Sequence, residues 1–318
     1  MTRTALLHSL VAAAAGAVLL AMAFAVPDSR VLLLNTFLAY GVLVVSLDLM
    51  VGDLNLLPAG HAAFFGAGAY CAVVLNQHVG WPLPLAGAAA VLGAAAVAAL
   101  VGLPMVGRTA GMSFAIATFA VGELMVQIVH KSPELLGGTQ GLTVSWGVGE
   151  EMPFGFSIYR YFSLWLAAAF VVALLVVVWI RNSHLGLRLT AIRDDENGAR
   201  GLGLNPTFYK TLVFAVASAL AAFAGVLWAP MVGFIGPESM GVSESIFLLS
   251  LLIVGGTRSV KGALAGVGLL MVLPMYLDLA PALRIALVGG ALAVIALVEP
   301  KGIVGLVSRV PLPRRRAA

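Results

Sequence analysis

Long apolar stretches separated by short polar gaps dominate this chain. Apolar windows fall at about 5–26, 31–51, 54–76, 83–106, 112–130, 161–180, 211–232, 244–256, 262–279 and 282–299. Most of them reach the roughly 20 residues that an α-helix needs to cross a bilayer. The runs are continuous rather than alternating, which favours helices over a transmembrane β-barrel. The pattern predicts an all-α polytopic membrane protein with about ten transmembrane helices.

Some windows do not have the form of a simple membrane-spanning helix. The third, eighth and ninth are short or rich in glycine, which predicts broken or re-entrant helices surrounded by protein. The first follows Arg3 and ends near Ala-Phe-Ala at 23–25, which resembles a cleavable signal peptide. Because the run at 5–26 is longer than a usual signal core, we expect it to be retained as the first helix.

Composition supports a membrane protein and argues against nucleic-acid binding. The chain is 61% hydrophobic and 10% charged, with a mean hydropathy of +1.04, too apolar for one soluble core. The net charge of +4 does not indicate a nucleic-acid surface, because the basic residues lie in the gaps between apolar runs. The single cysteine, Cys71, excludes an intrachain disulfide and is expected to serve in packing.

The basic residues predict the orientation in the membrane. If the N-terminus is cytoplasmic and the windows alternate, the outer side receives only Arg30, Lys131, Arg160 and Arg284 of the 18 Lys and Arg residues. The positive-inside rule therefore places both termini in the cytoplasm, together with the segment 181–210 and the basic tail 301–318. No domain boundary is visible, so residues 1–318 are predicted to form one membrane domain.

Residues 181–210 form the most polar segment, with eight charged residues. Asp194 is a suitable helix N-cap, Asp195 and Glu196 suit a first turn, and Gly203 suits the residue that ends a helix. The spacing of the apolar residues predicts one stripe along this helix: Leu189, Ile192, Ala199 and Leu202. The helix either packs as a loop on the protein's own helix ends or docks on a cytoplasmic partner.

Motifs for catalysis, metal binding and nucleotide binding are missing from the sequence. It contains no G-x-x-x-x-G-K-[ST] phosphate loop, no His/Cys pair at metal-ligand spacing, and no H-E-x-x-H or G-x-S-x-G. We therefore expect no catalytic residue, no metal and no cofactor bound by this chain. Energy for any transport must come from an ion gradient or from another subunit.

Several segments resemble one known family. The run "LRLTAIRDDENGARGLGLNPTFYK" resembles permeases of ATP-binding-cassette importers for branched-chain amino acids, of the LivM type. Four other stretches share the likeness: "GHAAFFGAGAY" (60–70), "FAIATFAVGEL" (114–124), "LLGGTQGL" (135–142) and "IVGGTRSVKGALAG" (253–266). "GFIGPES" (233–239) resembles a further family signature. Arg258 stands where the family usually has Gly, and Ala263 where it usually has Pro.

The resemblance implies a permease subunit in a bacterial inner membrane. Its expected partners are a second related permease, two cytoplasmic ATPases that bind ATP and Mg, and a periplasmic binding protein. The implied cargo is Leu, Ile or Val, with urea, short amides or other amino acids as the alternative. The ATPase-coupling residues would be Arg193, Asp194, Asp195, Glu196, Ala199, Leu202 and Gly203. An ion-coupled secondary transporter and a non-transporting assembly protein are less well supported classes.

Candidates for the translocation path or for helix packing lie in two windows. They are Gly60, His61, Phe64, Gly66, Gly68 and Glu123. A carboxylate such as Glu123 at bilayer depth costs roughly 2.5–3.5 kcal/mol on insertion scales, so it should face protein or water. It either ties helices together through a hydrogen bond, which we favour, or contacts the path. His61 fits a packing donor better than a ligand, and Asp48 and Asp53 are weaker candidates near the inner end of their window.

Overall fold

The structure is a computed structural model that describes residues 27–107, 111–144, 157–298 and 302–309. Six long helices make up most of it: α2 (Asp28–Leu54), α3 (His61–Gln77), α4 (Leu83–Val106), α5 (Met112–Lys131), α7 (Ile158–Asn182) and α10 (Pro206–Val232). Four shorter elements lie between these helices: α6 (Pro133–Leu136) and η1 (Gly138–Gln140) follow α5, and α8 (His184–Asp194) and α9 (Glu196–Gly201) follow α7. After α10 come η3 (Pro237–Met240), α11 (Val242–Gly255), α12 (Val260–Val267), the π-helical turn η4 (Gly268–Val272), α13 (Leu273–Tyr276), α14 (Pro281–Val298) and α15 (Gly302–Arg309).

The described helices confirm a polytopic helical membrane protein. Five of them, α2, α4, α5, α7 and α10, are long and apolar enough to cross a bilayer. α4 occupies the predicted window 83–106, where Pro82 and Gly107 flank the apolar run. The third window holds α3, which has only 17 residues and begins at His61. The window 5–26 lies outside the described residues, so the expected number of ten spans and the placement of the termini stay predictions.

The predicted break in the eighth and ninth windows is present. α11 and the α12–α13 segment are long and apolar enough to span a membrane only when taken together, and they are bent by 120° at residues 256–259. Gly255 and Gly262 allow the two arms to approach, because a Cβ on either would lie within 3.0 Å of the other's backbone. The pair is therefore a broken span or a re-entrant loop packed on α2 and on α15.

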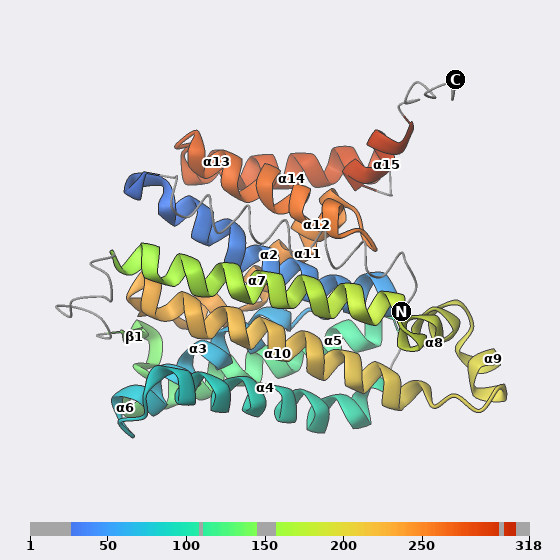
Figure 1. The fold of residues 1–318 in the computed structure, drawn as a ribbon, viewed down its shortest axis with the longest axis horizontal. Helices are drawn as coiled ribbons and strands as arrows, with labels where there is room; N and C mark the ends of the chain where they lie inside the picture. The colour runs from blue at the N-terminus through green and yellow to red at the C-terminus, as the bar shows by residue number, and fades with distance from the viewer. Residues whose placement is uncertain (1–26, 108–110, 145–156, 299–301, 310–318) are drawn as a thin grey trace.

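The core forms around α10, which packs against α2, α3, α4 and α7 (Figure 1). Small residues of α10 let α3 approach closely, since a Cβ on Gly225 would overlap the carbonyl oxygen of Phe65. Three buried rings, one each from α3, α10 and α5, make edge-to-face contacts: Phe64 and Phe114 lie 5.4 and 6.0 Å from Phe214 between centroids. The centre of the bundle is thus closed by apolar packing.

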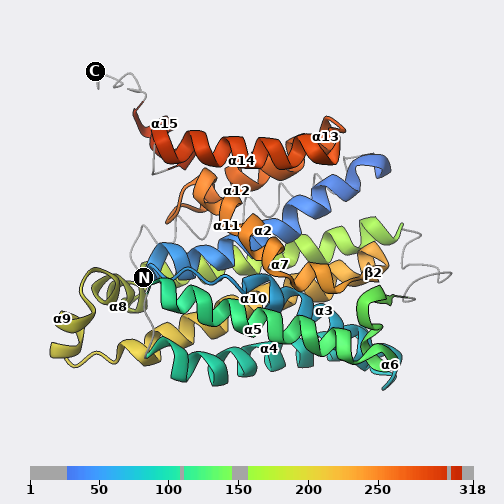
Figure 2. The ribbon, with the colours of Figure 1, turned by 180° about the vertical axis from the view of Figure 1, so that it is seen from behind.

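The two ends of the bundle differ in their elements (Figures 1 and 2). At one end, β1 (Leu142–Thr143) and β2 (Phe234–Ile235) pair antiparallel, with Leu142 opposite Ile235, and α6 lies nearby. At the other end, α8 and α9 project beyond the last turns of α7 and the first turns of α10. α14 lies along one edge of the molecule, on α11 and η4.

Candidate functional site

The polar segment 181–210 folds as two short helices rather than one. α7 ends at Asn182, and Ser183 caps α8 by accepting a hydrogen bond from the amide of Leu185. α8 ends at Asp194, and Asp195 caps α9 by accepting from the amides of Asn197 and Gly198 at 3.0 Å. The predicted N-cap, Asp194, is therefore wrong by one residue, because the backbone is extended at Asp195 (φ −150°) and not before it.

The end of α9 agrees with the sequence prediction. The helix stops at Gly201, and Gly203 has a φ of +82°, the left-handed conformation that glycine adopts at little cost. Nothing lies within 4 Å of the position that a Cβ on Gly203 would take, so its requirement is conformational only. Asn205 then caps α10 by accepting from the amide of Phe208, and Pro206 begins that helix.

The predicted apolar stripe does not form one surface. Leu189, Ile192 and Ala199 are buried in the main core of this chain, whereas the side chain of Leu202 is 83% exposed. The prediction of one continuous stripe is wrong, because the backbone is extended at Asp195 and the helical period does not continue through it. One face of α8 and α9 therefore packs on the protein's own bundle, and the exposed apolar residues of the segment are Leu187, Leu202 and Phe208.

Ion pairs hold this segment against α10. Glu196 accepts from Lys210 at 2.6 Å and from Arg200 at 2.8 Å, and the Lys210 side chain is nearly buried. Arg188 donates to the Tyr209 hydroxyl at 2.8 Å and lies over its ring. The start of α9 and the middle of α8 are thus both fixed to the first turn of α10, which passes through the bundle.

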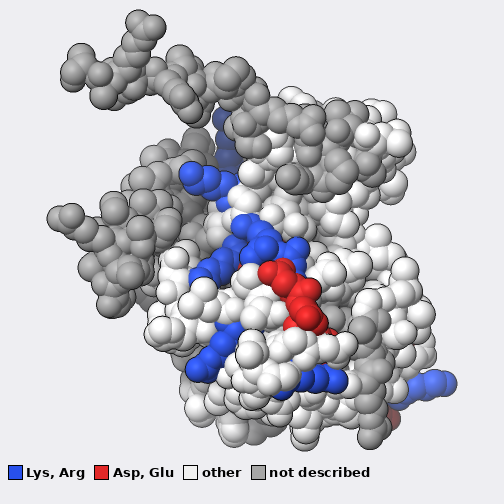
Figure 3. All heavy atoms as spheres, turned by 90° about the vertical axis from the view of Figure 1, so that its right-hand side faces the viewer, with Lys and Arg blue, Asp and Glu red and all other residues white. Residues whose placement is uncertain are grey.

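Arg193 has no such partner among the described residues. It makes no hydrogen bond or ion pair there, and its Nη1 atom is buried without an acceptor. Figure 3 shows this end of the molecule, where basic side chains surround a smaller acidic group. The exposed charged residues of this end are Arg188, Arg200, Arg258, Lys261, Asp194 and Asp195.

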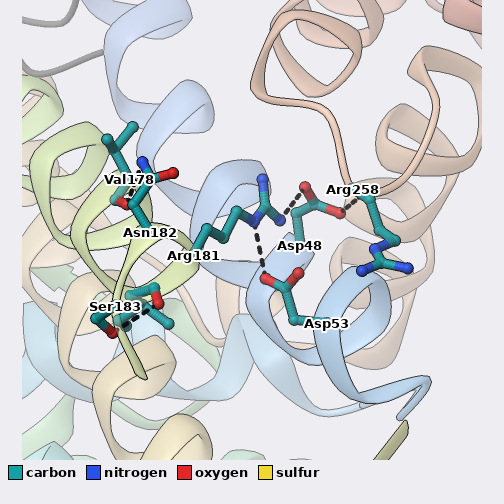
Figure 4. A network of polar contacts seen from close by, with 8 residues as sticks. Asp48, Asp53, Val178, Arg181, Asn182, Ser183 and Arg258 are labelled. Atoms are coloured by element: carbon teal, nitrogen blue, oxygen red, sulfur yellow. Dashed lines mark hydrogen bonds and ion pairs between the residues drawn. The ribbon is translucent and has the colours of Figure 1, made fainter. Parts of the chain in front are cut away.

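A buried charge network lies directly beneath the segment (Figure 4). Arg181, at the end of α7, donates to Asp48 at 2.7 Å and to Asp53 at 2.9 Å, both in α2. The amide of Arg258, in the bend between α11 and α12, donates to Asp48 at 2.8 Å. The network therefore joins α2, the α7–α8 connection and the bend, and a cavity of about 160 Å³ separates it from Leu189 and Thr190 of α8.

This network is more important in the structure than the sequence pattern indicates. Asp48 and Asp53 were expected to be weaker candidates, because acids near a membrane surface are easily hydrated. In the structure Asp48 is 1% exposed and paired. Two acids five residues apart at the end of one window, with an arginine at the end of another, were the available signal.

The candidates at residues 60–68 serve as close contacts between helices. A Cβ on Gly60 would overlap Thr118 of α5, one on Gly66 would overlap Met240 of η3, and one on Gly68 would overlap Ala222 of α10. The fully buried His61 has its Nε2 3.0 Å from Ser46 Oγ, while Ser46 donates to the Leu43 carbonyl. Phe64 is buried in the aromatic cluster.

Two acids inside the bundle have different surroundings. Glu123 of α5 is half-buried and makes no hydrogen bond or ion pair with any described residue. Glu244 of α11 was not among the predicted candidates. It accepts a hydrogen bond at 2.7 Å from the hydroxyl of Tyr40, which lies in the middle of α2. Within the described residues, no group of three His, Cys, Asp or Glu side chains could hold a metal ion.

Apolar crossing helices, a broken helix pair and a charged end with projecting helices together define a polytopic helical membrane protein. The family described as "Branched-chain amino acid transport system / permease component" matches residues 29–297, and the chain belongs to this family. It is 30% identical to the LivM permease protein of the high-affinity branched-chain amino acid transport system of Salmonella typhimurium, over 83% of this chain and 67% of that protein.

Other relatives share shorter regions. The LivH permease protein of Escherichia coli is 29% identical over 50% of this chain and 52% of its own length. An autoinducer 2 import system permease, LsrC of Yersinia pseudotuberculosis, is 30% identical over 33% of this chain and 31% of its own length. No solved structure matches the chain.

Proposed function

We propose that this chain is one of two permease subunits of an ATP-driven importer that carries Leu, Ile and Val across a bacterial inner membrane. The second subunit is a related permease, two cytoplasmic ATPases bind ATP and Mg, and a periplasmic binding protein delivers the amino acid. The proposal is supported by family membership and by the similarity to LivM over 83% of this chain. This chain binds no cofactor of its own.

The end of the bundle formed by α8 and α9 is the ATPase-docking end. The carrying observation is that α9 exposes Leu202 while its other face is fixed to α10 by Glu196 and Lys210. A six-residue helix is unstable alone in water, and here the ion pairs and the buried Ala199 keep it in place. An exposed apolar residue on a rigidly held helix is suited to fill a cleft of a soluble partner.

The distribution of basic residues supports a cytoplasmic position for this end. Basic side chains cover much of this end (Figure 3). Those of the polar segment are Arg181, Arg188, Arg193, Arg200 and Lys210, and Arg258 lies in the bend that meets the charge network. Lys131 ends α5 and Arg160 begins α7, at the end where β1 and β2 pair (Figure 1). The positive-inside rule then orients α8 and α9 towards the cytoplasm.

Coupling runs from α9 to the membrane helices through fixed contacts. Movement of α9 pulls on α10 through Glu196–Lys210, and movement of α8 acts on the network of Arg181, Asp48 and Arg258. The network touches the bend between α11 and α12, so a displacement at the docking end reaches a broken helix pair. Broken helices in transporters commonly adjoin the substrate route.

Replacing Gly203 with Val tests the docking role. A β-branched residue is strained at a φ of +82°, so the end of α9 must rearrange and Leu202 must move. We expect ATPase co-purification in detergent and amino-acid-stimulated ATP hydrolysis to fall together, while the amount of permease in the membrane fraction stays the same. Recovery of the ATPase at the wild-type level would contradict the proposal.

Gly201→Val is the matched control. Gly201 lies two residues before Gly203, as the last residue of α9, has no positive φ, and has open space around its Cβ position. This variant adds the same side chain without the conformational conflict, so it should retain most of the ATPase. Uptake of labelled leucine by the reconstituted importer, with urea and a cationic amino acid as competitors, tests the cargo separately.

A further inference from the structure

A cavity between α11, the η4–α13 segment and α14 combines polar groups with an apolar wall. Its volume is about 420 Å³, within the range of roughly 300–1,000 Å³ typical of small-molecule sites. The wall contributed by α11 runs from Ser243 to Ser250, two helical turns or about 10 Å. The space is therefore large enough for an amino acid of leucine size.

Among the described residues that line this cavity, Arg284, at the start of α14, is the only charged one. Its Nε donates to the Leu279 carbonyl at 2.7 Å, which holds the guanidinium in place. Its terminal nitrogens make no hydrogen bond with a described residue, and Nη2 is 4.0 Å from Asp278, whose carboxylate is fully exposed. The guanidinium thus retains donors for a carboxylate, the group that it binds best.

The α11 wall offers acceptors on the opposite side. Ser250 donates its hydroxyl hydrogen to the Ile246 carbonyl, so the lone pairs of its oxygen are available. Ser243 also lines the cavity, so the α11 wall presents a second hydroxyl. An ammonium group is suited to this wall, because it needs acceptors.

The remaining wall is apolar and broad. It consists of Ile246, Phe247, Leu270, Met271 and Val288. Leu270 and Met271 belong to the π-helical turn η4, a departure from regular helix of the kind frequently found at functional sites. Methionine and branched side chains around an open space suit a flexible aliphatic ligand.

We propose that this cavity binds a free α-amino acid with a branched aliphatic side chain. Arg284 binds the carboxylate, one serine hydroxyl of α11 faces the ammonium, and the apolar wall covers the side chain. This inference rests on the proposed import function and adds to it a site within the membrane domain. The bound amino acid would lie against α11. The other end of α11 leads into the bend where Arg258 contacts the charge network.

A second cavity in the same bundle shows why lipid is the poorer occupant. The cavity between α4, α7 and α10 has a volume of about 520 Å³, and its described lining residues, such as Leu83, Val91 and Phe223, are almost all apolar and include no charged one. An apolar lining of this kind is sufficient for a lipid chain. In the α11–α14 cavity, a hydrocarbon chain would leave the terminal nitrogens of Arg284 without an acceptor.

Cysteine protection in the full chain reconstituted in nanodiscs tests the site. Gly289 lines the cavity and has open space at its Cβ position, so Gly289→Cys, in a chain carrying Cys71→Ala, reports its occupancy. Gly290→Cys is the matched control, because Gly290 has equally open space and does not line the cavity. The measurement is the labelling rate with N-ethylmaleimide, with and without millimolar L-leucine.

We expect leucine to slow labelling of Gly289→Cys at least fivefold and to leave Gly290→Cys unchanged. Isoamylamine, which has the same side chain but no carboxylate, should not protect. Arg284→Gln should abolish protection, whereas Lys261→Gln, which removes an exposed cation elsewhere, should keep it. A Gly289→Cys chain that does not label without leucine, equal protection by isoamylamine, or protection that survives Arg284→Gln would each overturn the proposal.

Lipid headgroup binding is a distinct outcome of the same test. If changing the nanodisc from neutral to anionic lipid slows labelling of Gly289→Cys while leucine does not, the cavity is a lipid site and the proposal fails. The import function is judged independently by leucine uptake in the complete transporter. Leucine uptake without protection of Gly289→Cys would contradict the proposed site in the cavity but not the import function. Absence of uptake for every branched-chain amino acid would contradict the proposed cargo.

Discussion

Arg181 joins two carboxylates of one helix, with its Nη2 2.7 Å from Asp48 and its Nε 2.9 Å from Asp53. The arginine side chain is 20% exposed, and the two carboxylates are 1% and 10% exposed. The planar guanidinium can serve both acids at once, which a lysine ammonium on a flexible stem cannot do with the same geometry. The last turn of α7 is in this way fixed to the last turns of α2.

Removing the cation should destabilise the protein strongly. Arg181→Met leaves two buried carboxylates without a partner, a loss of about 3–5 kcal/mol in the free energy of unfolding. The measurement is thermal unfolding of the purified permease in detergent. Asp278→Asn, which changes a fully exposed carboxylate, is the control and should have no effect. Combining Arg181→Met with Asp48→Asn and Asp53→Asn should recover most of the loss, and failure to do so would contradict the charge explanation.

Arg258 offers a test in the opposite direction. Its φ is +60°, in the region where a non-glycine residue costs roughly 1–2 kcal/mol. Arg258→Gly keeps the amide that donates to Asp48, so we expect an unchanged or higher melting temperature. Arg258→Val should lower it, because a β-branched residue tolerates this backbone least. Equal melting temperatures for the Gly and Val variants would show that the bend rearranges freely.

Two glycines of α3 should differ in their tolerance of alanine. A methyl group at Gly68 would meet the backbone of Ala222 at 2.5 Å, whereas at Gly66 it would meet the flexible side chain of Met240. Overpacking of this kind typically costs about 1–3 kcal/mol. Gly68→Ala should therefore lower the yield of monodisperse protein clearly more than Gly66→Ala. The reverse order would mean that α3 and α10 can separate.

The unpaired Arg193 and the exposed Leu202 should contribute to ATPase docking separately from permease stability. Leu202→Ala removes a side chain that makes little contact within this chain, and Arg193→Gln removes a guanidinium without an intramolecular acceptor. Each should weaken ATPase binding about five- to thirtyfold, as expected for losing 1–2 kcal/mol at an interface. Binding of the detergent-solubilised permease to the immobilised ATPase measures this. A fall in the melting temperature of the permease alone would assign the residue to the fold.

Substitutions at Glu123 can distinguish a contact within this chain from a contact with another subunit. A hydrogen bond that ties helices together was predicted for Glu123, but no described residue provides one. Glu123→Leu should therefore leave the melting temperature of the isolated permease nearly unchanged and reduce recovery of the second permease, with Glu123→Gln intermediate. Loss of folded permease with Glu123→Leu in the absence of partners would restore the first explanation.

Local signals predicted the long elements well. The apolar run between Pro82 and Gly107 gives α4, and the glycine-rich windows near the end give the bent α11–α12 pair, because length and flanking residues determine both. The role of Gly203 just after the end of α9 could likewise be predicted from the sequence, since positive φ strongly favours glycine.

What the sequence could not provide was any relation that depends on distant residues. Asp194 and Asp195 are equally suitable caps by type, and only the positions of the amides of Asn197 and Gly198 decide between them. The exposure of Leu202 follows from the break at Asp195, through which no period continues. Pairing of Arg181 with Asp48 spans 133 residues, and no local pattern shows it.

That separation has a consequence for biosynthesis. Asp48 and Asp53 leave the ribosome well before Arg181, and at a synthesis rate of about 5–20 residues per second the 133 intervening residues take roughly 7–27 seconds. During that interval the two acids have no arginine partner, so they must stay where water can solvate them. The inner end of α2 can therefore reach its buried state only after the last turn of α7 has been made.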